Sequence, residues 1–214
     1  MTTGRVLIVG ASRGIGLGLV RSYLDDGWTV HATTRTPEAP GELGSLAGPI
    51  VVHGFDVLDE TDGLIPSVGG LDVLIHNAGV GRGTPRGLMM AVNAEAPIRV
   101  AQDFLDAGAL TTGGKVVLVT SQMGARRGST GSLGDYGDSK AALNDEFRAR
   151  ADAWRDAGIV AIVMHPGWVR TDMGGEAAPL SIEESAEGMR SLISTLGPDH
   201  HGRFWTWDGR EHPW

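Results

Sequence analysis

The stretch Val6-Leu7-Ile8-Val9-Gly10-Ala11-Ser12-Arg13-Gly14-Ile15-Gly16 sets the frame for the whole chain. Four apolar residues predict a buried strand, and the glycines that follow lead directly into a helical pattern. Glycines allow a tight turn and close backbone approach, and free N–H groups at a helix N-terminus can face a pyrophosphate. An ordinary strand–helix turn would look similar. We take Gly10, Ser12, Arg13, Gly14, Ile15 and Gly16 as candidate dinucleotide-binding residues.

Six further apolar runs follow the first strand, and amphipathic helical segments separate them. Most of these runs show no alternation, which is typical of strands buried on both faces of a parallel sheet. The pattern favours βαβ units in a doubly wound α/β fold, with residues 1–214 as one domain. The predicted strands are Val6–Val9, Trp28–Ala32, Ile50–Phe55, Leu71–Ile75, Lys115–Thr120, Ile159–Met164 and Arg203–Trp207.

Composition narrows the possible functions. The 214 residues carry a net charge of -8, which argues against non-specific binding to nucleic acid. The absence of cysteine excludes disulfides, thiolate zinc sites and thiol catalysis, and we predict no metal site. No apolar run is long enough for a membrane span, and a strand begins near the N-terminus instead of a signal peptide, so we expect a cytoplasmic protein.

The end of the second strand suggests which dinucleotide binds. Enzymes that use NAD place an acidic residue there to bind the ribose 2′-hydroxyl, but this chain has Thr34 followed by Arg35. Arg13 could approach the same region from the glycine loop. Two guanidinium groups would bind a 2′-phosphate strongly, which favours NADP(H) as the cofactor. Alternatively, both arginines are solvated surface residues.

Tyr136-Gly137-Asp138-Ser139-Lys140 is the strongest catalytic signal. On a helix, residues four apart share a face, so the phenol and the ammonium come together. A nearby ammonium and an oxidised nicotinamide favour the phenolate and lower the phenol pKa toward the working range of an acid–base catalyst. Ser121 follows the fifth strand and could donate a hydrogen bond to a substrate oxygen. The alternatives are an ordinary tyrosine at a helix start, a surface lysine and a turn serine.

Together these motifs resemble the short-chain dehydrogenase/reductase family. The resemblance covers the GxxxGxG spacing of the loop at Gly10, Ser121, the YxxxK pair, the Asp56-Val57 and Asn77-Ala78-Gly79 strand ends, and Asn93. It is closest to the C-factor/sniffer-like carbonyl reductase subgroup. That subgroup shares Leu17-Gly18-Leu19-Val20, the stretch from His165 to Gly175, Ala178-Pro179-Leu180, and the ending from Asp208-Gly209 to Trp214.

The resemblance implies a Rossmann-type sheet of strand order 3-2-1-4-5-6-7 and hydride transfer between NADP(H) and a carbonyl or alcohol substrate. Tyr136 would be the general acid, Lys140 would bind the nicotinamide ribose, and Asn93, at a local helix break, would hold a water that relays protons to the lysine. Further cofactor contacts are implied for Asp56, Val57, Asn77, Ala78, Gly79, Pro166, Gly167, Val169 and Thr171. A homodimer is possible and a monomer is not excluded. The alternative function is a dinucleotide-sensing or signalling protein on the same fold.

The chain departs from the family between Asn77 and Asn93, which are only 16 residues apart. The helix bearing Asn93 is therefore expected to be truncated at its start, leaving Arg82, Gly83, Pro85 and Arg86 as a short loop. This loop either opens the pocket beside two arginines or is a trimmed surface loop. Met123, Trp168 and Met173 are candidates for apolar pocket wall or for core packing.

Two other places are less typical of the family. His76 replaces its usual first Asn before Asn77, and we interpret it as structural and not catalytic. In the tail, alternation puts Trp205 and Trp207 on one face of the last strand. That face would be covered by the last helix or by another subunit. Trp214 would then be free to reach the substrate pocket or a partner subunit.

Overall fold

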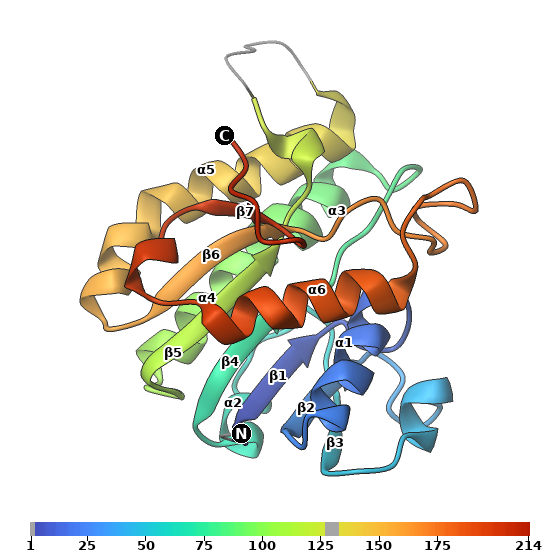
Figure 1. Ribbon diagram of the computed structural model, residues 1–214, viewed down its shortest axis with the longest axis vertical. Coiled ribbons are helices and arrows are strands. Elements are labelled where there is room, and N and C mark those ends of the chain that lie inside the picture. The colour runs from blue at the N-terminus through green and yellow to red at the C-terminus, as the bar shows by residue number, and fades with distance from the viewer. Residues whose placement is uncertain (1–2, 127–132) are drawn as a thin grey trace.

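The computed structural model describes residues 3–126 and 133–214 and contains one sheet of seven parallel strands (Figure 1). The strand order is β3-β2-β1-β4-β5-β6-β7, which confirms the predicted doubly wound fold. The strands are β1 (Arg5–Val9), β2 (Thr29–Thr34), β3 (Ile50–Gly54), β4 (Leu71–His76), β5 (Leu110–Val119), β6 (Val160–His165) and β7 (Phe204–Thr206).

Helices cover both faces of this sheet, so the strands are apolar on both sides. Val6 and Ile8 of β1 pack toward α1 (Gly14–Asp25) and α6 (Ile182–Thr195), which lie side by side across the near face in Figure 1. Leu7 and Val9 face the other core, which contains residues of α4 (Ala96–Asp106) and α5 (Gly134–Asp156). This burial on two sides explains why the strand sequences do not alternate.

The remaining helical segments are short. They are η1 (Gly41–Ser45), α2 (Ile65–Val68), α3 (Arg86–Met90), the π-helical turn η2 (Ala91–Glu95), η3 (Gln122–Gly124) and η4 (Pro198–His200). α3, η2 and α4 follow one another without a break, so Asn93 is preceded by only a five-residue helix. The predicted truncation is therefore correct, although Arg86 begins the helix and does not belong to the loop. No helix in the described ranges is both long and apolar enough to cross a membrane.

All seven strands have at least one bound that differs from the prediction, and β2, β5 and β7 show the physical reasons. β2 continues to Thr34 because the polar residues Thr33 and Thr34 still pair with β3. β5 already begins at Leu110, and its pairing with β4 shifts register between Leu71 and Val73. The glycine pair before Lys115 hid this early part in the sequence. β7 is only three residues long.

The C-terminal tail packs on the chain's own helices. Trp205 and Trp207 contact the cluster that contains Met189 and Ile193, so the last helix covers that strand face. The Trp214 ring lies 5.7 Å from the ring of Phe204. It also lies 6.4 Å from the ring of Phe147 in α5, and the Arg148 guanidinium lies 5.0 Å from its centroid.

Candidate active site

The glycine loop between β1 and α1 leaves no room for a side chain at Gly10 or at Gly16. Gly10 has φ of +81°, and a Cβ there would lie 2.6 Å from the Cα of Ala78. A Cβ at Gly16 would lie 2.1 Å from the Gly10 carbonyl oxygen. Gly14, with φ of +56°, has only the Thr171 side chain within 4 Å of such a Cβ, at 3.4 Å. The loop is therefore tightly packed underneath and open above Gly14, as a cradle for a phosphate group requires.

The ends of β2 and β4 are hydrogen-bonded to this loop. The Gly10 N–H donates to Thr33 Oγ1 at 3.0 Å, and the Ala11 N–H donates to the Thr33 carbonyl at 2.9 Å. Asn77 Nδ2 donates to the Gly10 carbonyl at 2.8 Å, so this predicted cofactor residue also has a structural role. Arg35, two residues after Thr33, is exposed and directly follows the strand.

The other residues predicted to bind the dinucleotide lie at the same carboxyl edge of the sheet. Arg13 pairs with Asp172 at 3.0 Å across the opening beside the glycine loop. Both side chains are about four-fifths exposed, at 78% and 81%, so this ion pair contributes little and is easily exchanged for another anion. Asp56 follows β3 and accepts a hydrogen bond from the Leu58 N–H at 3.0 Å, next to the buried Val57.

The segment after β6 faces the glycine loop. Ser185 Oγ donates to the Pro166 carbonyl at 2.6 Å, which fixes the segment to α6. Gly167 has φ of +88°, and a Cβ there would lie 2.3 Å from Leu180 Cδ1. The Thr171 hydroxyl accepts a hydrogen bond from the Gly174 N–H at 3.1 Å, and its methyl group lies opposite Gly14. Val169 pairs with Leu180, so the predicted cofactor contacts after β6 lie on an anchored segment.

Ser121 and Tyr136 come together because η3 packs tightly against the start of α5. Ser121 caps η3 by accepting a hydrogen bond from the Met123 N–H at 3.1 Å. A Cβ at Gly124 would lie 2.6 Å from the Lys140 carbonyl carbon, and a Cβ at Gly137 would lie 3.0 Å from the Met123 carbonyl oxygen. These two glycines let the segments touch through their backbones.

Burial raises the pKa of the Tyr136 phenol above its ordinary value, and a hydrogen bond with the Ser121 side chain lowers it in part. Removing the phenolate from water has the largest effect, and the lowering expected from Lys140 together with an oxidised nicotinamide stays a prediction. Lys140 is buried, and its Nζ donates to the Val119 carbonyl at 2.9 Å. Burial lowers the pKa of Lys140 to about 8.

Asn93 lies in the π-helical turn η2, at the helix break that the family resemblance implies. Its Oδ1 accepts from the Val80 N–H at 2.8 Å, and its Nδ2 donates to the Val80 carbonyl at 2.9 Å and to Ser139 Oγ at 3.1 Å. A Cβ at Gly79 would lie 3.2 Å from Asn93 Oδ1 and 3.7 Å from Lys140 Nζ. Glycine at position 79 therefore keeps open the space between the amide and the ammonium.

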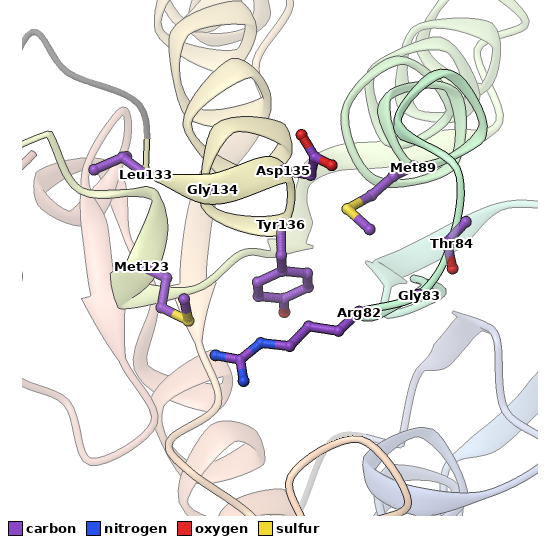
Figure 2. Close-up of a pocket in the computed structure, with 9 residues that line it drawn as sticks. All are labelled: Arg82, Gly83, Thr84, Met89, Met123, Leu133, Gly134, Asp135 and Tyr136. Carbon is purple, nitrogen blue, oxygen red and sulfur yellow. The ribbon is translucent and has the colours of Figure 1, made fainter.

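Tyr136 lines a pocket of about 260 Å³ together with the short loop after β4 (Figure 2). Its lining residues are Arg82, Gly83, Thr84, Met89, Met123, Leu133, Gly134, Asp135 and Tyr136. Of the two alternatives for Met123, pocket wall and core packing, the structure therefore shows pocket wall. Trp168 and Met173 do not line this pocket and are more than half exposed, so neither is a core residue.

Sequence reasoning missed five lining residues, which are Thr84, Met89, Leu133, Gly134 and Asp135. Asp135 directly precedes Tyr136, so its place in the chain was a signal that could have identified it. Met89 and Leu133 left no such signal, because they reach the pocket only through the packing of α3 against α5.

His76, at the end of β4, is a buried polar residue. Neither of its ring nitrogens has a hydrogen-bond partner within residues 3–126 and 133–214. Burial lowers its pKa to about 3, and the nearby charge of Lys140 acts in the same direction. The ring is therefore neutral at ordinary pH, which agrees with its interpretation as a structural residue.

Known proteins resemble this chain over most or all of its length. The family model described as short chain dehydrogenase matches residues 4–180. C-signal of Myxococcus xanthus is 40% identical over 164 residues, which cover 68% of this chain and 94% of that protein. The structure of the carbonyl reductase Sniffer of D. melanogaster aligns over 100% of both chains, with 28% identity and a TM-score of 0.88. A carbonyl reductase from Pseudomonas aeruginosa PAO1 in complex with NADP aligns over 100% of both chains, with 33% identity and a TM-score of 0.84.

Proposed function

The chain belongs to the short chain dehydrogenase family, and we propose that it reduces a ketone or aldehyde with NADPH, or oxidises the corresponding alcohol with NADP⁺. One observation carries this proposal. Tyr136 lines a pocket at the carboxyl edge of the sheet, and the nearby Ser121 side chain lowers the pKa of its phenol in part. In open α/β sheets, ligands bind at this edge.

The residues of the dinucleotide end fit NADP(H). The cradle above Gly14 suits the pyrophosphate, and the exposed guanidinium of Arg35 follows β2 with no ion-pair partner in the described part of the chain. Asp56, Val57, Asn77, Ala78 and Gly79 would border the adenosine half, and Pro166, Gly167, Val169 and Thr171 the nicotinamide half. When bound, the cofactor supplies a hydride from nicotinamide C4. The NADP complex of the related Pseudomonas aeruginosa reductase supports the same choice.

Tyr136 and Ser121 would act together on the substrate oxygen. As the carbonyl carbon receives the hydride, negative charge develops on the oxygen, and Tyr136 Oη transfers its proton there. Ser121 Oγ donates a hydrogen bond to the same oxygen and stabilises the developing charge. A phenol whose pKa is raised by burial stays protonated at neutral pH, as a proton donor for reduction must.

Lys140 and Asn93 would return a proton to Tyr136. The pKa of Lys140, lowered to about 8, lets its ammonium release a proton more readily than an exposed lysine does. Asn93 is held by Val80 and Ser139, so its Oδ1 faces the space beside Lys140 Nζ in a fixed position. A water molecule in that space would connect the two residues.

A dinucleotide-binding signalling protein is the second candidate, and the identity of 40% to a protein named C-signal favours it. A sensor would need the glycine loop and Arg35. It would not need Tyr136 and Ser121 together at a pocket, which is why we place reduction first.

NADPH oxidation at 340 nm with a panel of ketones and aldehydes tests the two functions against each other. Tyr136→Phe should bind NADPH nearly as wild type does and lower kcat by about 10²–10⁴, the usual contribution of general acid catalysis. Wild-type protein that binds NADPH but oxidises it with none of the carbonyl compounds would leave the signalling function. Turnover that survives in Tyr136→Phe would refute the assigned proton donor.

A further inference from the structure

Arg82 lies at the tip of a turn that the shortened segment after β4 creates. The Thr84 N–H donates to the Gly81 carbonyl at 3.3 Å, and Gly83 has φ of +88°. A positive φ at the third position is the mark of a type II turn, so Arg82 occupies the second position of the turn. Figure 2 shows its side chain running beneath the phenol end of Tyr136, with the guanidinium between that ring and Met123.

The turn is anchored on both sides of Arg82. Two residues earlier, the Val80 backbone exchanges two hydrogen bonds with the side chain of Asn93, at 2.8 and 2.9 Å. Met173 packs over Gly81, where a Cβ would lie 3.1 Å from Met173 Cγ. The backbone that carries Arg82 is therefore held by the same amide that lies beside Lys140.

The charge of Arg82 is not neutralised by the described residues. Arg86, four residues later, donates to Asp135 at 2.8 Å and to Asp138 at 3.2 Å, so it uses the nearby carboxylate that lines the pocket. Arg82 forms no ion pair or hydrogen bond with any residue in 3–126 or 133–214. Among the described residues, Arg82 is thus a cation without a partner in the pocket that Tyr136 lines.

The rest of the pocket suits a small apolar body. Met89, Met123 and Leu133 supply apolar wall, and a volume of about 260 Å³ is small for a ligand site. A guanidinium is suited to a planar carboxylate, which it can bind with two parallel hydrogen bonds.

We propose that Arg82 binds an anionic group of the substrate, so that the pocket selects short-chain oxo acids, in which a carboxylate lies a few carbons from the carbonyl. This inference rests on the proposed function for the identity of the reacting group. The carbonyl oxygen would lie at Tyr136 and Ser121, and the carboxylate would lie at Arg82.

Binding to the NADP⁺-loaded protein tests this independently of turnover, because the oxidised cofactor has no hydride to give to the probe. The probes are 4-oxopentanoate and its methyl ester, which share the carbonyl and differ in charge, with dissociation constants measured by calorimetry. Wild type should bind the acid at least about tenfold more tightly than the ester, a difference of about 1.4 kcal/mol. Arg82→Met should remove this preference. Arg126→Met is the matched control, because Arg126 pairs with Asp145 outside the pocket, and it should keep the preference.

Three results would overturn the proposal. The first is equal or undetectable binding of acid and ester to wild type, and the second is a preference for the acid that persists in Arg82→Met. The third is a weaker affinity of Arg82→Met for NADPH with no change in the acid-to-ester ratio, which would make Arg82 a cofactor contact. Turnover is scored separately. If wild type binds the acid through Arg82 and oxidises no NADPH, the proposed reduction is wrong and the anion site stands.

Discussion

Replacing His76 by Asn should make the protein less sensitive to acid. The His76 ring is buried, both ring nitrogens lack a partner among the described residues, and burial lowers its pKa to about 3. In the unfolded chain a histidine has a pKa of about 6.5. Between these two values the unfolded state binds a proton that the folded state does not, so stability falls as the pH falls from about 6.5 toward 3.

The size of this effect follows from the two pKa values. Protonation of the unfolded chain contributes almost nothing at pH 7.5. At pH 5.0 it favours unfolding by about 2 kcal/mol, since one pKa unit corresponds to about 1.36 kcal/mol. An asparagine does not titrate, so His76→Asn should lose about 2 kcal/mol less than wild type between these two pH values. Its stability at pH 7.5 can be lower without affecting this comparison.

Urea unfolding at pH 7.5 and 5.0 measures the difference by linear extrapolation. Leu74→Ala is the matched control, because it removes buried side-chain volume from the same strand without removing a titrating group. It should lower stability similarly at both pH values and keep the wild-type acid sensitivity. If His76→Asn loses as much stability as wild type between pH 7.5 and 5.0, the His76 ring is not held neutral and the reasoning from its burial is wrong.

Three further outcomes follow from the structure. Gly124→Ala places a Cβ 2.6 Å from the Lys140 backbone and should lower kcat at least tenfold with little change in NADPH affinity. Gly87→Ala is the control, because a Cβ there has no atom within 4 Å, and it should behave as wild type in the same assay. NADPH should bind more tightly than NADH, and Arg35→Ala should weaken NADPH binding by about 1.5–3 kcal/mol in fluorescence titrations while leaving NADH binding unchanged. Equal dissociation constants of wild type for the two cofactors would contradict the assignment. Trp214→Ala should lower the free energy of unfolding by about 1–2 kcal/mol, because ring packing is lost. The substrate KM should not change, because Trp214 does not line the pocket beside Tyr136, and a changed KM would connect the tail with that pocket.

Local patterns in the chain were enough to predict the sheet and the residues at its carboxyl edge. Each of these signals depends on neighbours in sequence. The glycines at 10, 14 and 16 indicate a turn that side chains would block, and Tyr136 and Lys140 share a helix face because of their spacing. Apolar runs without alternation indicated a sheet covered on both faces. The truncation of the helix before Asn93 could also be predicted, because only 16 residues separate Asn77 from Asn93.

Properties that depend on distant segments had to come from the folded molecule. The raised pKa of Tyr136 could not be predicted, because desolvation depends on how closely η3 and α5 pack at Gly124. Trp214 packs on Phe204, ten residues earlier, and on Phe147 in α5, which is far away in sequence. Arg82 could be identified as a loop residue, but its position beneath Tyr136 follows from the hydrogen bonds between Val80 and Asn93. Burial and long-range contacts set these properties, and neither is encoded in the spacing of neighbouring residues.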